Sequence, residues 1–188
     1  MLPEVRAALG EPVLKADVYE LEQAIGDEVQ RDLLAAVVDG SLSVADLMSD
    51  TFLYELHRRL YGDIWQWAGR RSARERNIGV SPELIAVELR SSLDNIMYRW
   101  DHTNDWDARG LGLVAHAETV RIHPFVDGNG RSTRLLAELV FVAAQDGPDL
   151  WTYDWDVDKT AYIHAVRQYD VAREVSHFVR LVPILPLD

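Results

Sequence analysis

The sequence predicts an all-α protein with one hydrophobic core. Apolar residues recur at helical spacing along most of the chain, and residues that start or stop helices stand between the periodic segments. The chain has 188 residues, of which 48% are hydrophobic, so it can bury a single sizeable core.

Two amphipathic helices are expected in the first third of the chain. The apolar spacing predicts one helix over Asp17–Val38, ended by Asp39-Gly40. It predicts another over Leu53–Ile64, after candidate N-caps between Ser49 and Thr51. We expect residues 1–50 to form a helical extension packed on a domain that spans residues 51–188.

The middle of the chain predicts two more helices. Ser81-Pro82 combines a favourable N-cap with a proline at the first helical position, and an apolar stripe follows it to Trp100. Asp105 or Asp107 can cap the next helix, which leads toward residue 122.

The following helix should be central, because Arg131–Gln145 is apolar almost all round before Gly147-Pro148 ends it. After an irregular link from Trp151 to Asp156, one helix is expected around Tyr162–Tyr169. Another is expected around Val175–Leu181. Tyr162 is expected to be a core residue on its spacing.

The segment from His123 to Arg134 is the most informative part of the chain, with the sequence His-Pro-Phe-Val-Asp-Gly-Asn-Gly-Arg-Ser-Thr-Arg. Gly128-Asn129-Gly130 can adopt the tight backbone of an anion nest. The N-terminus of the next helix would face that nest with its free N–H groups. Arg131 and Arg134 share one helical face, and guanidinium groups suit phosphate oxygens. The segment therefore predicts a phosphate site.

Three further residues of the segment have expected roles. Asp127 is the candidate Mg²⁺ ligand, since Mg²⁺ beside phosphates takes one or two carboxylates. His123 is the candidate general base because the ordinary pKa of imidazole, about 6.5, lies near neutrality. Phe125 is expected to anchor the segment in the core. Each feature alone is common in loops, and their combination carries the prediction.

This string resembles the signature of the Fic (Fido) family, His-Pro-Phe-x-[Asp/Glu]-Gly-Asn-Gly-Arg-x-x-Arg, with every fixed position present. The resemblance implies an all-helical core with a short β-hairpin flap. It also implies transfer of AMP from ATP to a hydroxyl of a target protein, with release of pyrophosphate. The implied roles are a base at His123, a Mg²⁺ ligand at Asp127, an inward anchor at Phe125, a phosphate cradle at Gly128, Asn129 and Gly130, and phosphate neutralisation by Arg131 and Arg134.

A second segment resembles the same family. Residues 56–69 are similar to the opening core helix of Fic domains, and residues 75–80 lie where the family places its target-docking flap. The expected flap residues are Asn77, Ile78, Gly79 and Val80, to whose edge an extended target segment would add as a strand. Residues 75–89 also resemble the subfamily named mobile mystery protein B.

Regulation and reaction type leave alternatives open. Many Fic proteins inhibit themselves with [Ser/Thr]-x-x-x-Glu-[Gly/Asn], and the nearest string here, which starts at Thr51, has the wrong last residue. We expect a separate small antitoxin protein to supply the glutamate to a toxin-like enzyme; the alternatives are inhibition by the helix Asp17–Val38 or no restraint. The alternative functions are phosphorylation of the target, transfer from another nucleotide, and binding by a catalytically silent module. Gly130 stands where phosphorylating relatives have lysine, which argues against phosphorylation.

Composition excludes several other classes of function. The net charge of −12 argues against non-specific binding to nucleic acid or to anionic membranes. No apolar run approaches the ~20 residues needed to span a bilayer. The chain has no cysteine, and His102, His116, His164 and His177 lack the spacing of a zinc site. We expect a cytoplasmic protein.

Overall fold

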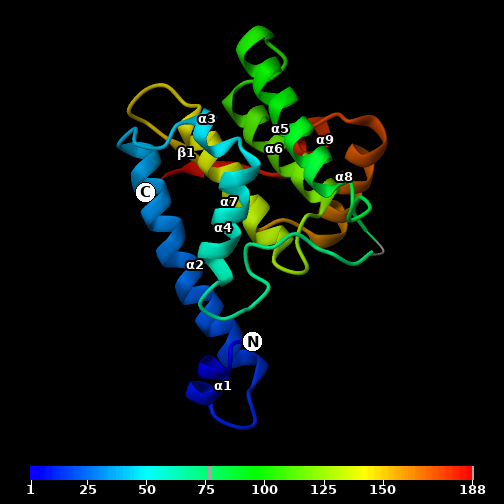
Figure 1. The fold of residues 1–188 in the computed structure, drawn as a ribbon. Coiled ribbons are helices and arrows are strands. Elements are labelled where there is room, and N and C mark those ends of the chain that lie inside the picture. The colour runs from blue at the N-terminus through cyan, green and yellow to red at the C-terminus, as the bar shows by residue number, and fades with distance from the viewer. Residues whose placement is uncertain (76–77, 188) are drawn as a thin grey trace.

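The computed structural model describes residues 1–75 and 78–187, and this part of the chain is largely helical (Figure 1). The helices in chain order are α1 (Pro3–Leu9), α2 (Lys15–Val38), α3 (Val44–Leu47), α4 (Asp50–Tyr61), α5 (Ile85–His102), α6 (Ala108–Ile122), α7 (Asn129–Ala143), α8 (Lys159–Ala172) and α9 (Ser176–Leu181). Two short strands, β1 (Trp151–Tyr153) and β2 (Ile184–Pro186), form an antiparallel pair. The predicted all-α helical bundle is confirmed.

The two helices that flank the His123–Arg134 segment form the centre of the bundle. In the described part of the chain, α6 and α7 pack against each other more extensively than any other two elements. Every residue of α7 from Leu135 to Val142 is buried, as its all-round apolar sequence predicted. Helices α2 and α4 pack on α7, while α5, α8 and α9 pack on α6. The segment between α6 and α7 is therefore held by the best-packed helices of the fold.

Helix α2 runs along one side of the molecule, and α1 lies at its N-terminal end (Figure 1). Val29, Leu33 and Val37 of α2 belong to the same hydrophobic cluster as the core helices. The N-terminal helix α2 thus packs on the core helices, and the division into residues 1–50 and 51–188 remains a proposal. None of the helices in the described residues is long and apolar enough to cross a membrane.

Two sequence predictions fail locally. The helix expected from Ser81-Pro82 begins at Ile85, because residues 81–84 form a turn in which the Leu84 N–H donates to the Ser81 carbonyl at 2.9 Å. The link expected to be irregular contains β1, whose partner β2 lies near the C-terminus, beyond α8 and α9 in the sequence. Strands of three residues carry too little periodicity to be recognised without the partner.

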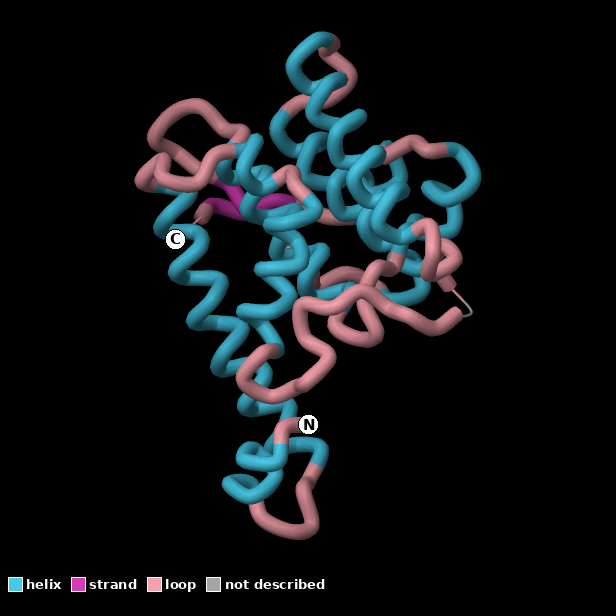
Figure 2. Tube along the Cα trace, viewed as in Figure 1, coloured by secondary structure: helices cyan, strands magenta, loops and turns pink. Residues whose placement is uncertain are grey.

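The connection between α4 and α5 is a long loop (Figure 2). Asn77 of the predicted hairpin flap lies outside the described residues, while Ile78, Gly79 and Val80 form bends rather than a strand. The Val80 N–H donates to the Ile122 carbonyl at 3.2 Å, so the backbone bonds to the end of α6 instead of a hairpin partner. The middle of the predicted hairpin, residues 76–77, lies outside the described residues, so the hairpin itself stays a prediction.

The segment between α6 and α7 is anchored from inside the core. Phe125 is fully buried and stacks on the His57 ring, with ring centroids 3.6 Å apart and planes at 10°. The buried Asn129 side chain receives the Phe125 N–H and donates to the Phe125 carbonyl, both at 2.9 Å. Phe125 thus anchors the segment, as the sequence predicted.

His57 connects α4 to this segment through both ring nitrogens. Its Nδ1 accepts the Gly69 N–H at 2.8 Å, so the neutral ring carries its proton on Nε2, which donates to the Asp127 carbonyl at 3.0 Å. Burial lowers the pKa of His57 to about 4, against the raising effect of its bond to Asp127. The ring is therefore neutral near pH 7.

We predict that stability falls as the pH drops from about 6.5 toward 4. In this range His57 is protonated in the unfolded chain but remains neutral in the folded protein, where burial lowers its pKa. The unfolded state therefore binds more protons, and a lower pH stabilises it relative to the folded state. Thermal unfolding at pH 7 and pH 5 measures the effect, and His57→Gln should flatten the pH dependence. An unchanged pH slope in that variant would contradict the assignment.

We predict that Asp107→Ala lowers the free energy of unfolding by about 1 kcal/mol, the usual cost of losing an N-cap. The Asp107 carboxylate caps α6 by accepting the Gly110 N–H at 2.7 Å. Asp105→Ala is the matched control, because Asp105 makes an exposed ion pair with Arg99. Urea unfolding of both variants measures the difference, and equal losses would contradict the assignment of the cap.

Candidate active site

His123 ends α6 in a left-handed backbone conformation, with φ 56° and ψ 58°. This conformation costs a non-glycine residue about 1–3 kcal/mol, so the surrounding structure must hold it. The flap packs directly beside it, since a Cβ built on Gly79 would lie 2.6 Å from the His123 Cβ and 2.8 Å from the Ile122 carbonyl oxygen. A glycine is required there by this contact and by its φ of +89°.

The turn before α7 also depends on a glycine. Gly128 has φ +74°, and an added Cβ would come within 2.5 Å of the buried Tyr61 ring. Helix α7 begins at the next residue, and no side chain caps its N-terminus. A Cβ built on Gly130 would meet nothing within 4 Å, so the space beside this glycine is open. The free N–H groups and the positive dipole end of α7 suit an anion in that space.

The Asn129 side chain holds the backbone of this turn in place. Its side-chain amide is committed to both backbone groups of Phe125. The side chain therefore shapes the turn, and the cradle that we infer for a phosphate consists of backbone groups.

Asp127 is exposed, and its Oδ1 accepts the Gly128 N–H at 2.7 Å. Among the described residues, no group of three or more metal-binding side chains gathers in one place. A lone carboxylate beside an anion cradle nevertheless fits Mg²⁺, which completes its shell with water and phosphate oxygens. The residues present therefore fit a metal ion that arrives with a nucleotide.

Arg131 is paired with a carboxylate from the N-terminal part of the chain. Glu22 of α2 is 7% exposed, and its Oε2 accepts from the Arg131 guanidinium at 2.5 Å. Its other oxygen accepts the Trp65 indole N–H at 2.7 Å. The Arg131 guanidinium also lies over the Tyr61 ring, whose burial raises the pKa of the phenol to about 12. Glu22 thus places a negative charge beside the predicted phosphate site.

Arg134 has an aromatic environment instead. Its guanidinium carbon lies 4.9 Å from the Tyr162 ring centroid and 5.4 Å from that of Trp155. In the described part of the chain, no carboxylate pairs with it, so its charge remains available to an anion. Tyr162 was expected to be a core residue, but it also lines the cavity beside His123.

Two adjoining cavities meet at His123. The first, of about 320 Å³, is lined by His123, Val126, Asp127, Gly128, Asn129, Gly130, Arg131 and Arg134. The second, of about 670 Å³, is lined by flap residues 78–80, the end of α6 and one face of α8. The structure therefore brings all the predicted residues of the segment together except Phe125, which faces the core.

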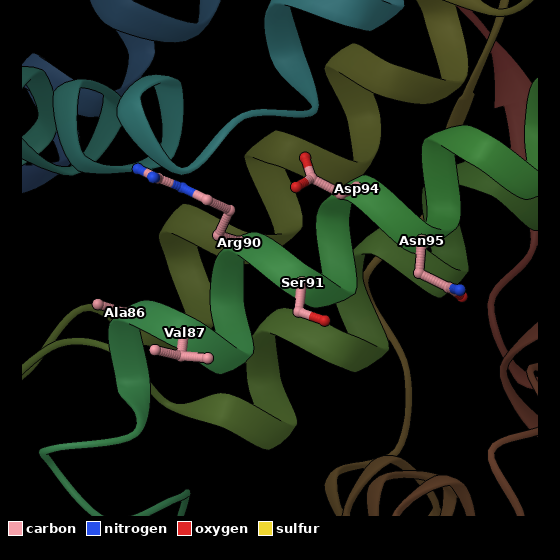
Figure 3. A pocket seen from close by; sticks show the side chains of 6 residues that line it. All are labelled: Ala86, Val87, Arg90, Ser91, Asp94 and Asn95. Atoms are coloured by element: carbon pink, nitrogen blue, oxygen red, sulfur yellow. The ribbon is translucent and has the colours of Figure 1, made fainter.

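A further hollow lies on the outer face of α5 (Figure 3). Its lining residues, Ala86, Val87, Arg90, Ser91, Asp94 and Asn95, all come from this one helix. Arg90 is already paired with Asp50 at 2.7 Å. This surface lacks the converging polar groups of a binding site, and the chemistry belongs to the cavities beside His123.

Sequence reasoning missed two residues of the site. His57 hydrogen-bonds to the Asp127 carbonyl of the segment. Glu22 pairs with Arg131, which lies 109 residues later in the chain. Nothing in the spacing of either residue indicates its partner. Only the packing of α2 and α4 on α7 brings them to the motif.

Known proteins resemble this chain in sequence and in fold. Protein adenylyltransferase fic-1 of Caenorhabditis elegans is 30% identical over 145 residues, which are 73% of this chain and 27% of that protein. Protein adenylyltransferase Fic of Drosophila mojavensis is 29% identical over 124 residues, 60% of this chain and 23% of that protein. The chain thus spans about a quarter of the length of these relatives.

Solved structures show the same fold. BepC of Bartonella tribocorum, with bound AMPPNP, aligns with a TM-score of 0.66 and 15% identity, covering 94% of this chain and 90% of that one. A Fic-domain signalling protein of Bacteroides thetaiotaomicron aligns with a TM-score of 0.66 and 21% identity. The alignment covers 84% of this chain and 64% of that one. The sequence model of the Fic/DOC family matches residues 47–141, which include α4 and the complete His123–Arg134 segment, and the chain therefore belongs to the Fic/DOC family.

Proposed function

We propose that the protein is a protein adenylyltransferase, which transfers AMP from ATP to a Ser, Thr or Tyr hydroxyl of a target protein and releases pyrophosphate. The observation that carries this proposal is the single cavity in which His123, Asp127, the N-terminus of α7 and Arg134 converge. The curated relatives named protein adenylyltransferase support the reaction type. A cytoplasmic setting, where ATP is abundant, belongs to the proposal.

The geometry supports an in-line displacement. His123 accepts the proton of the target hydroxyl, and the oxygen attacks the α-phosphorus of ATP. The new phosphorus–oxygen bond forms as the bond to the β-phosphate bridge breaks, and pyrophosphate leaves with the electron pair. The backbone N–H groups at the start of α7 and the guanidinium of Arg134 stabilise the phosphate charge. Mg²⁺ bound with ATP would neutralise further phosphate charge, with Asp127 as its protein ligand.

The target would approach over the flap. Ile78, Gly79 and Val80 line the larger cavity beside His123, and the Ile78 side chain is 61% exposed. In this proposal, Ile78 and Val80 contact the target segment, while Gly79 lets the flap approach the base closely. Asn77 completes the proposed flap.

Other reactions on this scaffold remain alternatives. Phosphorylation or transfer from another nucleotide would use the same base and cradle. A silent module that binds proteins would need neither, and one that binds nucleotides would need the cradle but not the base. Gly130 stands where phosphorylating relatives have lysine, and this residue favours AMP transfer over phosphorylation.

Regulation has two candidate sources. A separate antitoxin protein that supplies an inhibitory glutamate, with a toxin-like role for the enzyme, remains one proposal. The Glu22–Arg131 ion pair favours the other, in which α2 restrains the site from within the chain. A phosphate that binds Arg131 must displace or repel the Glu22 carboxylate, so the ion pair opposes nucleotide binding.

We predict that His123→Ala lowers AMP transfer by roughly 10²–10⁴-fold, because it removes the general base. Affinity for a non-hydrolysable ATP analogue should change little. Label from α-labelled ATP in cell lysate, with γ-labelled ATP in parallel, measures the transfer. Label from the γ-phosphate alone would indicate a kinase, and loss of folding in the variant would show that His123 is structural.

We predict that Glu22→Gln raises nucleotide affinity by about tenfold, the usual scale of a charge-assisted hydrogen bond, because it frees Arg131. AMP transfer at subsaturating ATP should rise with it. Glu20→Gln is the matched control, since Glu20 is an exposed residue of the same helix. Unchanged affinity and transfer in Glu22→Gln would leave two alternatives, inhibition by a separate protein or an enzyme without restraint.

A further inference from the structure

The Arg134 guanidinium lies beside neutral aromatic groups. The Tyr162 and Trp155 rings face its guanidinium, and its buried Nε has no hydrogen-bond partner among the described residues. Aromatic faces attract a guanidinium without neutralising its charge. Arg134 therefore differs from Arg131, whose charge is compensated by Glu22.

A buried histidine lies behind Tyr162. The His116 Nε2 is 3.0 Å from the Tyr162 hydroxyl, and His116 is fully buried in α6. Burial lowers the pKa of His116 to about 3, and the positive charge of Arg134 lowers it further. The Thr133 backbone acts in the opposite direction and raises this pKa. The imidazole is therefore neutral near pH 7, with one ring nitrogen free to accept a hydrogen bond.

The contact between His116 and Tyr162 holds the ring that faces Arg134. The Tyr162 hydroxyl is 3.0 Å from the His116 Nε2, and the centroid of the Tyr162 ring is 4.9 Å from the Arg134 guanidinium carbon. Burial raises the pKa of Tyr162, so its hydroxyl stays protonated near pH 7 and can take part in this hydrogen bond. Because an aromatic face attracts a guanidinium, the position of the ring helps to set the position of Arg134.

We propose that His116 and Tyr162, with the Trp155 ring opposite, act as positioning residues that hold the Arg134 guanidinium toward the phosphate chain of the nucleotide. This inference rests on the proposed function, in which Arg134 binds phosphate. The three residues come from α6, α8 and the segment between β1 and α8, so the position of Arg134 depends on how these elements pack around α7.

The test compares two nucleotides by calorimetric titration, a non-hydrolysable ATP analogue and AMP, each with Mg²⁺. Tyr162→Phe retains the ring and removes the hydroxyl, so analogue affinity should fall roughly three- to tenfold. Affinity for AMP, which lacks the outer phosphates, should stay unchanged. His116→Phe should lower analogue affinity in the same direction.

The control is Tyr169→Phe on the same helix. Tyr169 is buried in the core, and its hydroxyl bonds to Glu118 at 3.0 Å. This variant should leave the affinity for both nucleotides unchanged. Thermal melting of each variant, together with far-UV circular dichroism, shows that the fold is retained.

A double-mutant cycle separates positioning from general packing. In an Arg134→Ala background, Tyr162→Phe should cause no further loss of analogue affinity, because the residue it positions is gone. Full additivity, or an equal loss of affinity for AMP and the analogue in Tyr162→Phe, would overturn the proposal. Unchanged analogue affinity in Arg134→Ala alone would instead contradict the phosphate role of Arg134 in the proposed function.

Discussion

The burial of Phe125 against His57 is the contact on which the arrangement of the site depends. This stack fixes the middle of the segment between α6 and α7, while Asn129 bonds to both backbone groups of Phe125. His57 also bonds to the Asp127 carbonyl, one residue before the turn at Gly128. The candidate base, metal ligand and anion cradle therefore share one rigid support from α4. Rigid placement of this kind is what transfer between two bound partners requires.

The electrostatics of the site differ between its two arginines. The chain carries a net charge of −12, yet two guanidinium groups lie on the first turns of α7, where the helix dipole already places positive charge. Glu22 and the Tyr61 ring accommodate Arg131, whereas Tyr162 and Trp155 accommodate Arg134 with neutral groups. One arginine is thus compensated inside the protein, and the other retains its charge for a ligand. An incoming phosphate chain would meet these two environments within one helical turn.

Much of the helical framework was predictable because helices are local structures. The apolar periodicity located α2, α4, α7 and α8. Local capping chemistry limited two N-caps to Ser49–Thr51 and to Asp105 or Asp107, and the structure uses Ser49 and Asp107. The start of α5 and the strands β1 and β2 were missed. A turn replaced the first helical turn at Ser81, and the two strands pair over a long sequence separation that no local pattern records.

The sequence by itself determined the composition of the candidate site, because His123, Asp127, the two glycines and both arginines lie within one short segment. Their proximity follows from the covalent chain, and their residue types restrict the chemistry. The tertiary structure decided how each group is supported and compensated. Glu22, His57, His116 and Tyr162 reach the motif from four different helices. Such contacts depend on which helix faces meet in the core, and this information is spread over the whole chain.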